Sequence, residues 1–276
     1  MRGNANRRQM NVLILTDFSA VSINAARYSL SLLREVPAKF HVLNIDTSDS
    51  SQDVLPDERE SIFREKLQGR IESLRSLSQN KDHRFEALFS RDNLLTATRR
   101  YVEEKNIDLI VMGAVRRDFL EHTLIGNHTY EIMKKVKCNL LAIPENSQFV
   151  APREVAIPID YSVSLDKRVL QFLGHSTVST GTRFTVMEVR EKVVPEGVSS
   201  AEEKDLFYPL SDRKLRFTEL ETEAVASKEQ FMQVQKEFDM LVLLGRNLSI
   251  CDRFLHTEHG LYSSVENRLP ILVLHG

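Results

Sequence analysis

The first half of the chain alternates short apolar runs with segments whose apolar residues recur every three or four positions. The short runs have the length and composition of buried strands, and they cover residues 11–16, 40–46, 83–90, 107–113 and 139–144. The segments between them predict amphipathic helices, the longest of which covers residues 57–77. Ser19 is expected to cap the helix after the first strand, and Pro37 to end it. This alternation predicts a parallel sheet with helices on both faces, which is the α/β class.

The same order of motifs returns in the second half of the chain. VAIPIDYS at 155–162 repeats VLILTDFS at 12–19, and FDMLVLLG at 238–245 repeats IDLIVMG at 107–113. FTVMEVR and LPILVLH repeat the second and the last strand in the same way. A repeat this long indicates tandem domains rather than a solenoid. We therefore expect an N-terminal extension at 1–9, a first domain at 10–146 and a second domain at 152–276, shortened because little remains of its second helix between Val194 and Tyr208.

Composition narrows the class of protein without assigning a function. A chain of 276 residues is long enough for two domains, and 42% hydrophobic with 28% charged residues suits packed cores. The net charge of −2 offers nothing that would recruit nucleic acid, and no apolar run has the length of a membrane span. Cys138 and Cys251 lack the spacing of a metal or redox pair, which fits a reducing cytoplasm. The basic N-terminus has no apolar stretch behind it, so no secretory signal is predicted.

Several of these motifs together resemble the universal stress protein family. They are the start MNVLILTDFS, the run DLIVMG, the spacing from that run to IGN, and the close VKCNLLAIPE. The chain is similar to a tandem two-domain member whose second domain is degenerate. The resemblance implies two five-stranded, parallel, Rossmann-like domains of the adenine-nucleotide alpha-hydrolase-like type. It also implies that the strands NLLAIP and ILVLH pair, so that the halves form an intramolecular pseudo-dimer; a homodimer of whole chains is compatible with it.

One branch of this family binds ATP through a loop with the pattern glycine, two residues, glycine, nine residues, glycine, then serine or threonine. Gly113 and Gly126 match the first and third glycines, whereas Arg116 replaces the second and Asn127 replaces the serine or threonine. Glycines let backbone amides approach phosphate, and a helix N-terminus adds partial positive charge. Arg116 places a bulky side chain where backbone should meet phosphate, although a guanidinium can itself bind phosphate. The alternatives are a loop that keeps only its structural glycines and a loop that binds ATP.

The other contacts that the resemblance implies are partly present. Asp17 matches the aspartate that reaches the ribose, and Asp160 matches it in the second half. Ile45 falls where an aliphatic residue faces adenine, and Met112 and His128, which flank the loop, complete the expected binding set. Asp17 could equally cap the following helix, and Ile45 could be an ordinary core residue.

The second half has no loop of this kind, because Gly260 follows Gly245 by fifteen positions with no glycine between them. Cys251, His256 and His259 match no common zinc pattern, so no metal site is expected. No Ser/His/Asp or Cys/His set can be assembled from the motifs, so no catalytic residue is expected. This disfavours an enzyme, including a nucleotidyltransferase, although weak ATP hydrolysis is compatible with the loop.

These patterns predict a non-catalytic, cytoplasmic stress-response protein that acts by binding protein partners or a small ligand. The alternative is an ATP-binding stress-response switch that uses the loop of the first domain. ATP is the one cofactor that the sequence suggests, and no particular protein partner is indicated.

Overall fold

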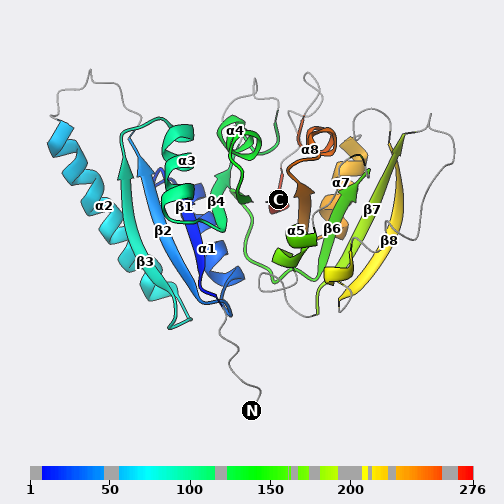
Figure 1. Cartoon of the computed structure of the whole chain (residues 1–276), viewed down its shortest axis with the longest axis horizontal. Coiled ribbons are helices and arrows are strands. Elements are labelled where there is room, and N and C mark those ends of the chain that lie inside the picture. Colours follow the sequence, from blue (N-terminus) through cyan, green and yellow to red (C-terminus); the bar gives the residue numbers. More distant parts are fainter. Residues whose placement is uncertain are drawn as a thin grey trace, which may run out of the picture.

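The computed structural model places helices on both faces of one continuous sheet (Figure 1). It describes residues 8–46, 56–115, 123–160, 162, 167–173, 181–191, 207–210, 213–222, 228–256 and 267–275. None of the helices in these ranges is long and apolar enough to cross a membrane.

The elements of the first half follow the predicted order. Its strands are β1 (Met10–Leu15), β2 (Ala38–Ile45), β3 (Arg84–Ser90), β4 (Leu109–Ala114) and β5 (Asn139–Pro144), and its helices are α1 (Ala20–Leu32), α2 (Pro56–Leu77), α3 (Leu94–Glu104) and α4 (Asn127–Lys135). As expected, Ser19 caps α1, and its hydroxyl accepts a hydrogen bond from the Ser22 amide at 3.3 Å. The helix ends earlier than its apolar periodicity predicts, because the Val36 amide turns back to the Leu33 carbonyl at 2.9 Å. Helical backbone is disfavoured directly before Pro37.

The second half repeats this order with shorter helices. Its elements are β6 (Glu154–Ile159), α5 (Lys167–Phe172), β7 (Arg183–Glu191), η2 (Tyr208–Leu210), β8 (Lys214–Thr222), α7 (Lys228–Glu237), β9 (Met240–Leu244), α8 (Leu248–Leu255) and β10 (Ile271–Leu274). The sequence motifs located four of its strands but not β8 or α7. The strand β8 pairs with β7 along its whole length, from Arg183↔Lys214 to Glu191↔Thr222.

The two halves join through their last strands. The strand order is β3-β2-β1-β4-β5-β10-β9-β6-β7-β8, which gives five strands to each half of a ten-stranded sheet. Neighbouring strands are parallel except β5 and β10, which pair antiparallel with Leu140 opposite Val273 and Leu141 opposite Leu272. The α/β class and the pairing of NLLAIP with ILVLH as a pseudo-dimer are confirmed.

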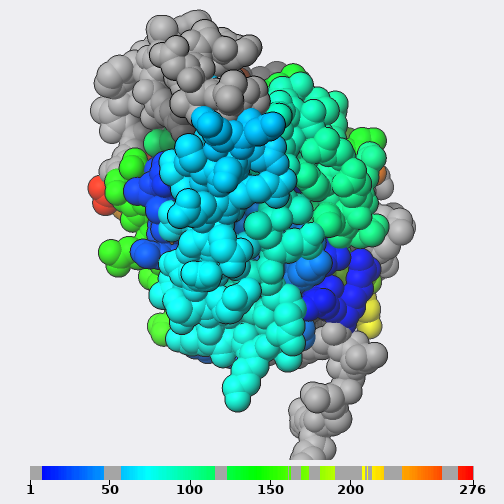
Figure 2. All heavy atoms as spheres, turned by 90° about the vertical axis from the view of Figure 1, so that its left-hand side faces the viewer, coloured from blue at the N-terminus to red at the C-terminus, as the bar shows by residue number. Residues whose placement is uncertain are grey.

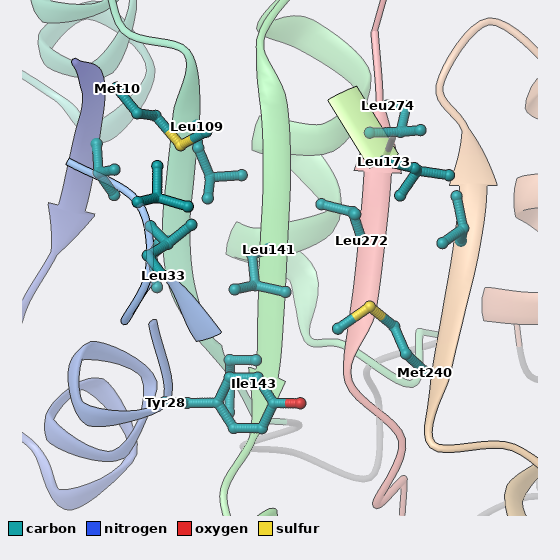
Figure 3. Close-up of a cluster of buried hydrophobic side chains, with 14 of the residues drawn as sticks. Met10, Tyr28, Leu33, Leu109, Leu141, Ile143, Leu173, Met240, Leu272 and Leu274 are labelled. Atoms are coloured by element: carbon teal, nitrogen blue, oxygen red, sulfur yellow. The ribbon is translucent and has the colours of Figure 1, made fainter. Parts of the chain in front are cut away.

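Buried apolar clusters cover both faces of the sheet and cross the junction. The cluster on the α1, α2 and α5 side includes Tyr28, Leu141 and Leu272, which Figure 3 shows around the paired strands. The cluster on the α3, α4 and α8 side includes Ile132 and Phe254. Side chains of the segment 56–104 form the outer end of the first half (Figure 2). Because residues of both halves share each cluster, the halves pack as one body around the β5–β10 pair.

Candidate functional site

The sheet topology gives each half one switch point, and the region outside the strand ends there is called the crevice of that half. In the first half the chain runs from β1 to β2 and β3 on one side, and then returns to β4 on the other side of β1. Ligands of open α/β sheets bind outside the carboxyl ends of the strands at such a switch point. The register Ile14↔Val111, continued along both strands, brings Asp17 after β1 next to the end of β4, where Gly113 lies. These two predicted site residues therefore lie at the same crevice.

The turn after β1 fixes the carboxylate of Asp17. The amide of Ser19 donates to its Oδ1 at 3.0 Å, and the Ser19 hydroxyl donates to the same oxygen. Between them, Phe18 has a φ of 63°, a left-handed backbone that is rare for a bulky residue. Such strain often accompanies a functional site, and no sequence motif indicated it. Asp17 is exposed at this turn, and its carboxylate supports the start of α1.

Ile45 and Met112 differ in how far their side chains reach the crevice. Ile45 ends β2 and is half-buried against the cluster on the α3 and α4 side. Just before it, the Asn44 side chain donates to the Thr16 carbonyl at 2.8 Å and holds the ends of β1 and β2 together. Met112 is 7% exposed and packs in the core of β4. A ligand at this edge of the sheet can meet the side chain of Ile45 more readily than that of Met112.

The start of α4 presents backbone donors without a side-chain cap. Gly126 is its N-cap residue, with φ 78° and ψ 152°, and it has no side chain that could cap the first-turn amides. Asn127 and His128, which follow it, are exposed. Thr129 ties this turn to β4, because its hydroxyl donates to the Gly113 carbonyl at 3.2 Å. An uncapped helix N-terminus at a switch point is suited to an anion.

Gly113 has a clear packing role. A Cβ at this position would lie 2.5 Å from Cγ1 of Val21 and 3.1 Å from its carbonyl carbon. The glycine therefore lets α1 approach the end of β4, whether or not a ligand binds. Arg116, the residue that departs from the glycine pattern, lies outside the described residues.

The corresponding crevice of the second half is bridged by side chains. Asp160 follows β6, and its Oδ1 accepts from Nδ2 of Asn247 at 2.6 Å, while its Oδ2 accepts from the Ser249 hydroxyl at 2.9 Å. The amide and hydroxyl of Ser162 also donate to Oδ1, at 3.0 and 2.7 Å. Partial burial acts to raise the pKa of Asp160, but these hydrogen bonds outweigh it, and the pKa lies below its ordinary value. Asn247 additionally caps α8 by accepting from the Ile250 amide at 3.1 Å.

Cys251 and His256, the described members of the cysteine and histidine set near α8, have different contacts. The Cys251 thiol is buried and donates to the Leu244 carbonyl at 3.4 Å, and burial raises its pKa to about 12. His256 contacts Tyr130 instead, with its Nε2 2.8 Å from the hydroxyl. His259 lies outside the described residues, and within the described ranges no group of three potential ligands could hold a metal ion.

A continuous sheet of two five-stranded halves, each with a crevice at its switch point, defines a tandem Rossmann-like protein. Residues 10–144 match the model of the universal stress protein family. The first half of the chain is therefore a universal stress protein domain, and the second half repeats its fold.

Solved structures extend this likeness over both halves. A universal stress protein from Archaeoglobus fulgidus DSM 4304 is similar with a TM-score of 0.65 and 12% identity, covering 95% of each chain. A putative universal stress protein from Pseudomonas aeruginosa UCBPP-PA14 has a TM-score of 0.53 and 12% identity, covering 98% of this chain and 95% of its own. At these identities the likeness shows the fold alone. No curated protein matches the sequence of this chain.

Proposed function

We propose that this protein is a non-catalytic stress-response protein that acts by binding, with one small-ligand site in its first half. The observation that carries the proposal is the difference between the two crevices. In the second half, Asp160 is bonded to Asn247 and Ser249 across the crevice, and Asn247 caps α8. In the first half, α4 begins at Gly126 without a side-chain cap, beside an exposed Asp17. The family membership supports a role in the stress response.

The chemistry of the first crevice suits an anionic ligand that also carries hydroxyl and apolar groups. The Asp17 carboxylate can accept from a sugar hydroxyl, the first-turn amides of α4 can donate to phosphate, and Ile45 can pack against a base. ATP has all three groups, so the second candidate function is an ATP-binding switch. Gly113 and Gly126 favour it, whereas Arg116 in place of a glycine opposes it. We propose residues 10–146 as the domain that carries the ligand site and residues 152–276 as the second domain.

Binding rather than catalysis is supported by the thiols. Burial raises the pKa of both Cys138 and Cys251 to about 12, so neither supplies a thiolate nucleophile near neutral pH. Both cysteines are free, which suits a reducing compartment, and we place the protein in the cytoplasm. Its partners under this proposal are a small ligand, other proteins, or a second copy of the chain.

Titration calorimetry of nucleotide-stripped protein with ATP and magnesium tests the proposal, together with a separate assay for nucleotide that copurifies. If the second candidate function holds, the titration should show about one ATP bound per chain. Asp17→Asn should weaken binding strongly, because the amide can no longer offer two charged acceptor oxygens, whereas its second-half counterpart Asp160→Asn, which reaches the first crevice only through α8, should weaken binding much less. Equal loss in both variants would contradict a site in the first half. No heat and no copurified nucleotide would exclude the ATP switch and leave protein partners as the binding function.

A further inference from the structure

The second half of the chain contacts the start of α4 directly. The Leu124 amide donates to the Leu255 carbonyl at 2.8 Å, and Thr123 and His256 form an isolated antiparallel bridge. Thr123 and Leu124 precede Gly126, whereas Leu255 and His256 lie at the end of α8. Figure 1 shows α4 and α8 next to each other near the middle of the molecule. Backbone hydrogen bonds between the halves therefore hold the segment that leads into the candidate ligand site.

A polar side-chain cluster holds the same segment from its other end. The Tyr130 hydroxyl donates to Oδ1 of Asp252, and Nε2 of His256 lies 2.8 Å from that hydroxyl. A phenol has one hydrogen, so the hydroxyl that donates to the carboxylate accepts from the imidazole. The two rings meet edge to face, with centroids 4.9 Å apart. Tyr130 belongs to the first turn of α4, and both of its partners belong to the second half.

The start of α8 is itself held at the crevice of the second half. Asn247 caps α8 and also donates to Asp160, so the start of this helix is fixed to the end of β6. The end of α8 then contacts α4 through Leu255 and His256. A continuous set of hydrogen bonds thus runs from the second crevice, through α8, to both sides of Gly126.

We propose that the second half acts as a clamp that positions the ligand site of the first half, with Tyr130, Asp252 and His256 as positioning residues. This inference rests on the proposed ligand site. The turn that bears Gly126, Asn127 and His128 lies between Leu124 and Tyr130, and both flanks are fixed by the other half. Ligand binding and contact between the halves are then coupled, and coupling is reciprocal. A ligand bound at α4 should slow hydrogen exchange in α8, and a change that loosens α8 should weaken ligand binding.

Native-state hydrogen exchange of the full chain, followed residue by residue, tests the clamp without a ligand. Tyr130→Phe keeps the ring but removes the hydroxyl, and Asp252→Ala removes its acceptor. We expect the Leu124 and Tyr130 amides to exchange about tenfold faster in both variants, relative to the Ile14 amide in the core of β1. Asp252→Asn retains an acceptor oxygen and should restore most of the protection. A general loss of stability would instead raise the rates at Leu124 and Ile14 together.

Tyr101→Phe is the matched control, because its hydroxyl donates to the Phe89 carbonyl at 3.1 Å within the first half. It should leave exchange at Leu124 unchanged. In calorimetry, Tyr130→Phe should weaken the affinity for ATP by about tenfold, whereas Tyr101→Phe should leave it unchanged. Equal exchange at Leu124 in Tyr130→Phe, Asp252→Ala and Tyr101→Phe would overturn the clamp. Faster exchange in a protein that binds no ATP would support the clamp while removing the nucleotide function.

Discussion

At the residue level, the two glycines of the candidate site are required for different physical reasons. A Cβ on Gly113 would press against Val21 of α1. Gly126 instead has φ 78° and ψ 152°, a backbone conformation that residues other than glycine rarely adopt. Gly113→Ala should lower the free energy of unfolding by roughly 1–3 kcal/mol through overpacking. Gly126→Ala should lower the free energy of unfolding by roughly 1–3 kcal/mol through backbone strain. It should also weaken the binding of any nucleotide, because the added Cβ would crowd the amides of α4.

Urea unfolding and calorimetry of the same variants measure the two glycine effects. Gly69→Ala is the control, because a Cβ there in α2 would meet nothing within 4 Å. It should leave stability unchanged or raise it by up to about 1 kcal/mol. If Gly126→Ala binds ATP as tightly as the wild type, the phosphate-loop interpretation is wrong.

A second residue-level prediction concerns the buried imidazole of His41. Its pKa is lowered to about 4, chiefly by burial; Glu86 opposes this shift, and Lys39 and Lys105 contribute to it. Nδ1 lies 3.2 Å from Oε2 of Glu86, a contact that favours the protonated ring, but within the described structure neither ring nitrogen makes a well-formed hydrogen bond. The unfolded chain binds this proton more tightly, since its histidine pKa is near 6.5. The neutral imidazole therefore contributes stability that is complete above about pH 6.5 and is lost as the pH falls toward 4.

The expected size of this pH effect is about 3 kcal/mol. It is measured as the difference between the unfolding free energies of wild type and His41→Leu from pH 7 to pH 4. The pKa values of His83 and His275 are also lowered by burial, but both residues titrate in both proteins and cancel in the difference. His128→Leu, at an exposed histidine of α4, is the control. Parallel pH curves for wild type and His41→Leu would contradict the prediction.

At the level of elements, the cap residue of α8 makes a second hydrogen bond in addition to the one that caps the helix. Asn247 is 2% exposed, accepts from the Ile250 amide and donates to the Asp160 carboxylate. Asn93 caps α3 in the same way, accepting from the Thr96 amide at 2.9 Å, but it is exposed and, within the described part of the chain, its side chain bonds to no carboxylate. We expect Asn93→Ala to cost about 1 kcal/mol, and Asn247→Ala roughly 2 to 4 kcal/mol.

Chemical denaturation of the two cap variants gives this comparison. The additional loss in Asn247→Ala should shrink in the Asp160→Asn background, because the two residues share one hydrogen bond. Equal losses at the two caps would show that the bridge to Asp160 adds no stability, and would weaken the link from the second crevice to α4.

The sequence predicted elements well where a local pattern defines them. Continuous apolar runs located β1 and β4, because a strand buried on both faces excludes polar residues. β8 was missed since it is an edge strand whose half-buried Leu215 and Phe217 alternate with Lys214 and Arg216. The resemblance to the universal stress protein family assigned Asp17, Gly113 and Gly126 to one site. The cluster of Tyr130 with Asp252 and His256 could not be found in this way, because its partners are 122 and 126 positions apart and meet only when the halves pack.

For the whole molecule, the pairing of β5 with β10 is the feature on which one-body packing depends. Deleting residues 151–276 removes β10 and leaves the apolar strand around Leu140 and Leu141 as an open edge. An open edge of this kind pairs with another chain, so the fragment should self-associate through β5. Sedimentation velocity should show a dimer or larger species for the fragment, whereas Leu141→Lys in the fragment should shift it toward monomer, because a buried lysine opposes strand pairing. A fragment that folds but stays monomeric at high concentration would mean that β5 needs no partner, and that the second half is retained for its contacts with α4 rather than to cover an edge.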